Sequence, residues 1–211
     1  MGASVTPGVD HVSFDGVPVT LPAEYRYLAY YKPRGILVSR KSQGGRKTIF
    51  QALGKRASGL HAVGRLDLDS EGLLLLTDDG ALSEALLHPR TAILRRYRVW
   101  IRPAPDPETM RKLAEGTIVE GVHVAPVRVR QEPATGKSSV LLIDLGEGRK
   151  REVRALARAA GLHVGRLQRI RFGPIDLGSL RPGTIRALED HELAALRRDA
   201  FRQASSGATL R

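Results

Sequence analysis

Residues 64–76 read Gly-Arg-Leu-Asp-Leu-Asp-Ser-Glu-Gly-Leu-Leu-Leu-Leu, an acidic turn that leads directly into four leucines. An apolar run of this length, bounded by Gly72 and by the turn Asp78-Asp79-Gly80, is typical of a buried strand. Asp79 can then cap a helix over 81–87, which His88-Pro89 ends. The segment therefore predicts a central buried strand that is preceded by a carboxylate-rich turn.

The other periodic segments predict more strands than helices. Strands are expected in two runs within 24–39, on either side of the turn Lys32-Pro33-Arg34-Gly35, and over 95–101, 122–130, 139–145 and 166–172. A tight hairpin is expected over 12–20, with its turn at Asp15-Gly16. Helices are expected over 48–54, 81–87, 106–116, 150–160 and 189–204. Because helices and strands do not alternate regularly, the sequence predicts an α+β fold with a mostly antiparallel sheet.

Composition limits the class of protein. The 211 residues contain no cysteine, which excludes disulfide frameworks and thiolate metal sites. Apolar runs such as Leu73–Leu76 are too short to span a bilayer, and the first residues lack the pattern of an export signal, so we expect a cytoplasmic protein. The 34 basic and 22 acidic residues give a net charge of +12, which favours a polyanionic partner. Nucleic acid is favoured over an anionic membrane, since no basic amphipathic helix of the membrane type is present.

The acidic turn holds the first candidate for chemistry. Its acids are spaced as in a calcium loop, but Gly64 and the leucine strand replace the two flanking helices, so no metal is expected. A solvated turn is the ordinary alternative. Against it, Asp67 is bracketed by Arg65 and by the apolar Leu66 and Leu68. A neighbouring guanidinium favours the carboxylate anion, which is the form that a covalent mechanism at carbon requires.

A second cluster, Gly146-Glu147-Gly148-Arg149-Lys150-Arg151-Glu152-Val153-Arg154, is a glycine turn that leads into a predicted helix. Arg151, Arg154 and Arg158 share one stripe of that helix, and the helix start supplies free amide donors for an anion. A solvated basic face is the commoner fate of such a stripe. In the strand 95–101, Tyr97 lies between Arg96 and Arg98, which suits base stacking beside phosphate contacts, although packing alone is the ordinary role of a strand tyrosine.

Together these segments resemble the RsuA branch of the pseudouridine synthases, which modify ribosomal RNA. The resemblance covers about 25–188 and rests on five motifs in order: 32–35, 64–80, 95–97, 148–154 and 169–177. It implies the pseudouridine synthase fold, with two subdomains around a central active-site cleft. It also implies that Asp67 is the nucleophile, that Arg149 pairs with Asp67 and that Tyr97 stacks on the target base. The further RNA contacts that we expect are Lys32, Arg65, Arg95, Lys150, Arg151 and Arg154.

The resemblance also implies a reaction and a domain plan. Uridine becomes pseudouridine without net oxidation or hydrolysis, so no cofactor and no metal are expected. We expect a catalytic domain over 25–204, a frayed tail over 205–211, and a lead-in over 1–24 that is the remnant of an S-four-type RNA-binding domain. The expected partner is RNA of the small or the large ribosomal subunit, and we expect a monomer.

Two departures and two alternatives accompany this interpretation. Arg95 stands where lysine is commoner, and Glu152 stands where glutamine is usual, which would place a negative charge near the RNA. An RNA-binding assembly factor could keep the fold without the chemistry, but it would be expected to lack Asp67 or Arg149. An RNA glycosidase would share attack at the anomeric carbon and would release free uracil.

Overall fold

The fold is that of a computed structural model that describes residues 10–19, 24–133 and 139–202. Nine strands belong to the main sheet: β3 (Tyr27–Lys32), β4 (His61–Val63), β5 (Glu71–Thr77), β6 (Arg95–Arg102), β9 (Arg128–Glu132), β10 (Ser139–Leu145), β11 (His163–Phe172), β12 (Ile175–Asp176) and β13 (Ile185–Ala187). Two separate hairpins pair β1 (Val12–Phe14) with β2 (Val17–Val19) and β7 (Thr117–Val119) with β8 (Val122–Val124). The helices are α1 (Ile49–Leu53), α2 (Gly80–Leu87), α3 (Pro107–Glu115), α4 (Glu152–Ala159) and α5 (Asp190–Phe201), with 3-10 helices η1 (Gly54–Ala57) and η2 (Pro89–Thr91).

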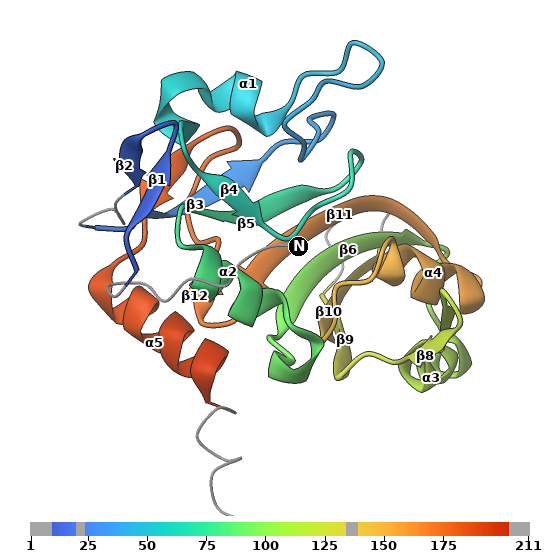
Figure 1. Ribbon diagram of the computed structural model, residues 1–211. Helices are drawn as coiled ribbons and strands as arrows, with labels where there is room; N and C mark the ends of the chain where they lie inside the picture. The colour runs from blue at the N-terminus through green and yellow to red at the C-terminus, as the bar shows by residue number, and fades with distance from the viewer. Residues whose placement is uncertain (1–9, 20–23, 134–138, 203–211) are drawn as a thin grey trace, which may run out of the picture.

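The main sheet runs in the order β13-β3-β5-β11-β6-β10-β9, with β4 along β5 and β12 along β11 (Figure 1). Among the described strands, β5 and β11 form the one parallel pair, and all other pairs are antiparallel. The predicted α+β class with a mostly antiparallel sheet is therefore confirmed.

Helices cover both faces of the sheet, and β5 contributes to both. All seven residues of β5 are buried. Leu74 and Leu76 pack in a cluster with residues of α1 and α4, whereas Leu73 and Leu75 pack in a second cluster with residues of α2 and α5. Because successive side chains of a strand point to opposite faces, a strand between two helical layers needs the uninterrupted leucine run seen in the sequence.

One edge of β5 is shared by two strands. β11 pairs with Glu71 and Gly72, and β4 pairs further along with 75–77. Where the partner changes, the main-chain oxygen of Leu73 accepts a hydrogen bond from Nε of Arg169 at 2.7 Å. Gly72 has a φ of 106°, and a Cβ at this position would lie 2.2 Å from the Arg169 carbonyl oxygen. Only glycine allows this close approach. The pairing partner of β5 therefore changes here from β11 to β4, and the loop 64–70 connects β4 to β5.

Most predicted elements are confirmed. Thr48, Asp79 and Asp106 cap α1, α2 and α3 through their side chains. The hairpin turns at Asp15 and Gly16, both with positive φ, although residue 20 lies outside the described residues. Within the predicted helix 150–160, Val153, Leu156, Ala157 and Ala160 are all buried.

Several details differ from the prediction. Residues 36–39 form no strand, because Leu37 makes only an isolated bridge to Thr48. The predicted strand over 122–130 is two strands, since Pro126 has no amide hydrogen to continue a ladder. The short strands β4, β7, β12 and β13 were not predicted. Each is two or three residues long, too short to show a period.

Candidate active site

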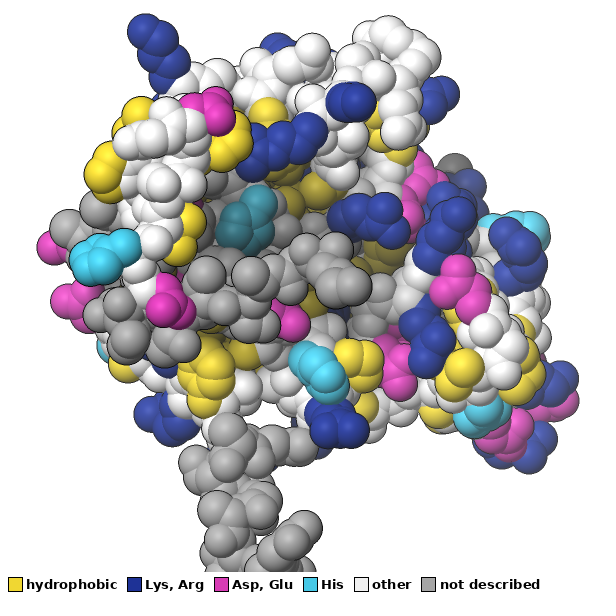
Figure 2. Space-filling view, viewed as in Figure 1, with side chains coloured by type: hydrophobic (Ala, Val, Ile, Leu, Met, Phe, Trp, Pro, Cys, Tyr) yellow, Lys and Arg dark blue, Asp and Glu magenta, His cyan; other side chains and the backbone are white. Residues whose placement is uncertain are grey.

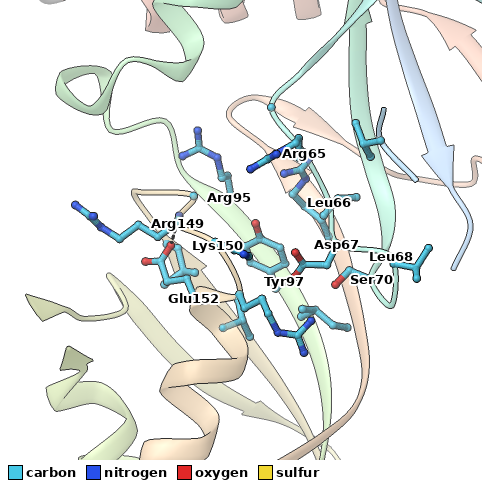
Figure 3. Close-up of a pocket in the computed structure, with 18 of the residues that line it drawn as sticks. Arg65, Leu66, Asp67, Leu68, Ser70, Arg95, Tyr97, Arg149, Lys150 and Glu152 are labelled. Carbon is cyan, nitrogen blue, oxygen red and sulfur yellow. Dashed lines mark hydrogen bonds between the residues drawn. The ribbon is translucent and has the colours of Figure 1, made fainter. Parts of the chain in front are cut away.

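A cavity of about 480 Å³ lies beside the loop 64–70 and is called here the Asp67 pocket. One wall comes from residues within 37–43 and 63–70, and the facing wall comes from residues within 145–153. Tyr97 of β6 and Arg169 of β11 also line it. Figure 3 shows Asp67 and Arg65 on one side, Arg149 and Glu152 on the other, and the Tyr97 ring between them. Segments far apart in the sequence, including the three predicted catalytic residues, therefore meet in one cavity.

The loop that carries Asp67 is fixed by main-chain hydrogen bonds. The Ser70 amide donates to the Asp67 carbonyl at 3.1 Å, and the Gly35 amide donates to the Leu68 carbonyl at 2.7 Å. Leu66 is buried, whereas Asp67 is partly exposed and lines the cavity. Within the described ranges, no side chain forms an ion pair with Asp67. The carboxylate thus belongs to a well-anchored loop but is itself free to meet a ligand.

Lys32 holds this loop from beneath. Its side chain is fully buried, and Nζ donates to the Ser70 carbonyl at 2.7 Å and to the Pro33 carbonyl at 2.9 Å. Burial lowers the pKa of Lys32 to about 8, although the carboxylates of Asp67, Asp69 and Glu71 act in the opposite direction. A fully buried ammonium with two carbonyl partners cannot contact a phosphate at the surface. Lys32 was expected to contact RNA, but in this structure its ammonium is directed at the loop and not at the surface.

Arg154 holds the same loop from α4. Its Nη2 donates to the Asp69 carbonyl at 3.2 Å and lies 3.1 Å from Oδ2 of Asp69, while Nη1 donates to the Val164 carbonyl at 3.3 Å. Only 11% of the Arg154 side chain is exposed. Burial lowers the pKa of Arg154, and Asp69 opposes this shift. Arg154 was expected to grip phosphate, but its donors are directed at the protein, so it is a positioning residue for the Asp67 loop.

Arg169 is a pocket residue to which the sequence analysis assigned no role. It is 2% exposed, and its Nη2 atom is buried without a hydrogen-bond partner among the described residues. Its guanidinium lies 5.4 Å from the centre of the Phe172 ring. The available signal was its position in the predicted strand 166–172, between the apolar Leu167 and Phe172, because a buried arginine requires either a partner or a site.

The strand around Tyr97 is arranged differently from the prediction in one respect. Tyr97, Val99 and Ile101 share the buried face of β6, as expected. Arg96 and Arg98 point to the other face, where they pair with Asp144 at 2.6 Å and Glu132 at 2.8 Å.

The arginines next to Tyr97 in sequence therefore do not flank it in the pocket, because a strand alternates. Arg95 does share its face, but it is 6% exposed, donates to the carbonyls of Ile93 and Gly146, and is a poor candidate for a phosphate contact. Burial lowers the pKa of Arg95.

The facing wall is more open. The Arg149 Nε lies 2.7 Å from Oε2 of Glu147, so the expected Arg149–Asp67 pair is not formed in this structure. Lys150 and Arg151 are exposed, and Arg151 reaches Oδ2 of Asp69 at a distance of 3.5 Å. On the opposite wall Arg65 is also exposed, and among the described residues it has no ion-pair partner. Arg65, Lys150 and Arg151 thus remain candidates for RNA contacts.

Glu152 does not put a charge on this surface. Its side chain is buried, and its Oε2 accepts a hydrogen bond from the Arg149 amide at 2.9 Å, which closes the turn before α4. Burial raises the pKa of Glu152, and the hydrogen bond from Arg149 opposes that shift. The expectation that Glu152 faces the RNA is therefore replaced by a role in the local backbone.

The pocket combines a carboxylate, an aromatic ring and a basic rim, which suits nucleophilic or base chemistry on an anionic, aromatic substrate. Within the described residues, no group of three or more His, Asp or Glu side chains could hold a metal ion. Over the same residues, no helix is long and apolar enough to cross a membrane.

Comparisons with known proteins agree with this chemistry. Residues 26–159 match a family described as RNA pseudouridylate synthase. A protein of Aquifex aeolicus named an uncharacterized RNA pseudouridine synthase is 39% identical over 197 residues, which cover 93% of this chain and 79% of that protein. The ribosomal large subunit pseudouridine synthase B of Bacillus subtilis is 33% identical over 93% of this chain and 81% of its own length.

Solved structures give the same result. The crystal structure of a pseudouridylate synthase superposes with a TM-score of 0.73 at 29% identity, over 93% of this chain and 84% of that one. The match between sequence, fold and pocket identifies the chain as a member of the RNA pseudouridylate synthase family, an isomerase, as the resemblance to the RsuA branch predicted.

Proposed function

We propose that this protein converts a specific uridine of ribosomal RNA into pseudouridine and that Asp67 is the nucleophile. The observation that carries the proposal is the position of the Asp67 carboxylate. It opens on the cavity from a rigid loop, beside the Tyr97 ring, and forms no ion pair with a described residue. Relatives named ribosomal large subunit pseudouridine synthase B support ribosomal RNA as the substrate.

The reaction exchanges one bond for another. The bond between uracil N1 and the ribose anomeric carbon breaks, the base turns, and carbon 5 forms the new bond while its hydrogen is lost and N1 gains one. Asp67 attacks the anomeric carbon, attacks carbon 6 of uracil, or removes a ribose proton. All three routes use the same ionised carboxylate, held within reach by the bonded loop.

Arg149 and Tyr97 complete the proposed site. Arg149 pairs with Glu147 in the structure, and both side chains are substantially exposed, so exchanging this partner for Asp67 costs little, on the order of 0–1 kcal/mol. In the proposed complex, Arg149 turns toward Asp67 and keeps it ionised and aligned. Tyr97 stacks on the extruded uracil and offsets part of the unstacking cost of a few kcal/mol.

The test of the nucleophile is Asp67→Asn, which keeps the shape and removes the charge. We expect this variant to bind RNA but to release no tritium from RNA whose uridines are labelled at carbon 5. Asp190→Asn is the control, because Asp190 is exposed, lies outside the pocket and forms no ion pair with a described residue. Substantial turnover by Asp67→Asn would refute the assignment, and free uracil in the wild-type reaction would indicate a glycosidase.

Stacking is tested separately at Tyr97. Tyr97→Phe keeps the ring, so we expect nearly wild-type RNA affinity, whereas Tyr97→Leu should lose about 1–3 kcal/mol of binding free energy. Both affinities are measured with a catalytically inactive Asp67→Asn background, so that turnover does not interfere. An equal loss in both variants would assign the role to the hydroxyl instead of the ring.

The proposal also includes the catalytic unit, its oligomeric state and its location. We propose that residues 25–204 form the catalytic domain and that the protein acts as a cytoplasmic monomer. Light scattering should then give a mass near the 23.0 kDa of a single chain.

A further inference from the structure

The positive charge of the protein is concentrated in one stretch of its sequence. Residues 25–66 contain ten of the 34 lysines and arginines and none of the 22 aspartates and glutamates. In the rest of the chain, the remaining 24 basic residues are nearly balanced by all 22 acidic ones. Ten of the twelve net positive charges therefore come from 42 residues, which form β3, α1, η1, β4 and the loops between them.

The cations of this stretch are also unneutralised in the fold. Among the described residues outside it, ten lysines and arginines form ion pairs with carboxylates. Inside it, Arg26 alone forms an ion pair with a described residue, which is Asp78. Six exposed residues of the stretch have cationic side chains that form no hydrogen bond or ion pair with a described residue, and they are called here the basic surface: Arg34, Lys41, Arg46, Lys47, Lys55 and Arg65.

The basic surface adjoins the mouth of the Asp67 pocket. Arg65 lines the pocket, and so do Ser39 and Gln43 of the loop that carries Lys41, Arg46 and Lys47. Arg34 lies in the turn whose Gly35 amide bonds the Asp67 loop. In Figure 2, dark blue side chains are spread over the upper part of the molecule, where Figure 1 draws α1 and the loop before it.

The end of that loop is held in place. Thr48 and Gln51 form a reciprocal capping box at the start of α1, and Arg40 donates to the Leu60 carbonyl at 2.6 Å. The unpaired cations thus belong to a segment whose ends are held by hydrogen bonds. The stretch 25–66 contains no carboxylate that could neutralise them. Fixed, unneutralised positive charge next to a catalytic pocket is the arrangement expected for binding phosphates.

We propose that the basic surface is the main phosphate-binding surface of this protein and that it holds the RNA that flanks the target uridine. This rests on the proposed function in so far as the ligand is the RNA substrate. Of the RNA contacts expected from the sequence, it keeps Arg65 and gives less weight to the segment 149–154. In that segment Arg149, Arg151 and Arg154 are already paired with Glu147 and Asp69.

The test compares two triple variants in the inactive Asp67→Asn background. Lys41→Gln/Arg46→Gln/Lys47→Gln removes three charges from the basic surface. Arg90→Gln/Arg158→Gln/Arg198→Gln removes three exposed arginines that form no ion pair with described residues and lie outside the stretch. Binding of a synthetic RNA stem–loop is measured by fluorescence anisotropy over a range of KCl concentrations.

For Lys41→Gln/Arg46→Gln/Lys47→Gln, called here the loop variant, the association constant should depend less steeply on salt. The negative slope of its logarithm against the logarithm of the KCl concentration should become smaller in magnitude by about 2, since each phosphate contact contributes roughly 0.7. At about 0.15 M salt, this corresponds to roughly 50-fold weaker binding. The control triple should change the slope by less than about 0.5. Equal effects of the two triples, or an unchanged slope for the loop variant, would overturn the proposal.

Two further measurements keep the result clear. If the loop variant has lost thermal stability, Lys55→Gln/Arg65→Gln tests the same surface without changing that loop, and an unchanged slope there would count against the proposal. The modification reaction is followed separately with the wild-type protein. Salt-dependent binding through the basic surface without pseudouridine formation would contradict the proposed function and leave this inference standing.

Discussion

The two walls of the Asp67 pocket are both rich in cations, but the partners of these cations differ. Behind the Asp67 wall, Lys32, Arg154 and Arg169 are buried or nearly so and donate to the main-chain carbonyls of Ser70, Asp69 and Leu73. On the facing wall, Lys150 and Arg151 are exposed, and Arg149 forms a pair with Glu147 in which the side chains are 30% and 43% exposed.

This difference separates two uses of positive charge within a single site. A buried cation that satisfies carbonyl groups fixes the position of a loop, because removing it leaves those buried groups without partners. An exposed cation in a weak ion pair can exchange its partner for a phosphate or a carboxylate at little cost. We therefore expect substitutions of the buried cations behind the Asp67 wall to act on catalysis and stability, and substitutions of exposed cations around the pocket to act on RNA affinity.

The largest effect is expected at Arg154. Arg154→Gln removes the contacts that hold Asp69, and a displacement of the nucleophile by about 1 Å can cost roughly 100-fold in kcat. The affinity for RNA should change little. Single-turnover kinetics and a separate binding titration measure the two quantities. Arg158→Gln, one turn further along α4 and exposed, is the matched control. Weakened binding with an unchanged kcat would make Arg154 a phosphate contact after all.

A smaller effect, on stability, is expected at Lys32. Its pKa in the folded protein is about 8, against a usual value of 10.5, so between these values the unfolded chain binds more protons than the folded one. The free energy of unfolding should therefore rise with pH in this window, by about 1–2 kcal/mol between pH 8 and 10, relative to Lys32→Met.

Urea unfolding at several pH values measures this difference. Subtracting the Lys32→Met curve removes the contributions of all other titrating groups, including Tyr27, Tyr30 and Tyr31, whose pKa values are raised mainly by burial. Lys55→Met, at an exposed site, should run parallel to the wild type. Parallel curves for wild type and Lys32→Met would mean that Lys32 is not desolvated as the structure indicates.

The smallest effect is expected at Glu147 on the facing wall. Glu147→Gln releases Arg149 from its partner and removes one carboxylate from the pocket mouth, so RNA should bind about two- to fivefold more tightly, equivalent to less than about 1 kcal/mol. Stability should be unchanged. Isothermal titration with an Asp67→Asn background measures the affinity. A lower kcat for Glu147→Gln in the active protein would indicate that Glu147 is required to position Arg149.

Much of the fold and the candidate site could be predicted from local pattern. The leucine run of β5, the strand β6 and the Asp79 cap of α2 depend on neighbouring residues, and all were confirmed. The concentration of charge in 25–66 is also visible in the sequence, as a long interval without an acid. Motif resemblance brought Asp67, Tyr97 and Arg149 together, and all three line one pocket.

The partners of the cations could not be predicted in this way. Lys32 and Arg154 were expected at the RNA surface from the motifs that carry the resemblance, and a local pattern does not show whether a lysine or arginine finds a buried partner. The sequence by itself determined which segments become strands and helices, and which residue types are available for chemistry. Tertiary structure decided which charges are buried, because the carbonyls that receive Lys32, Arg154 and Arg169 belong to 69–73 and reach them only when β3, α4 and β11 pack around the start of β5.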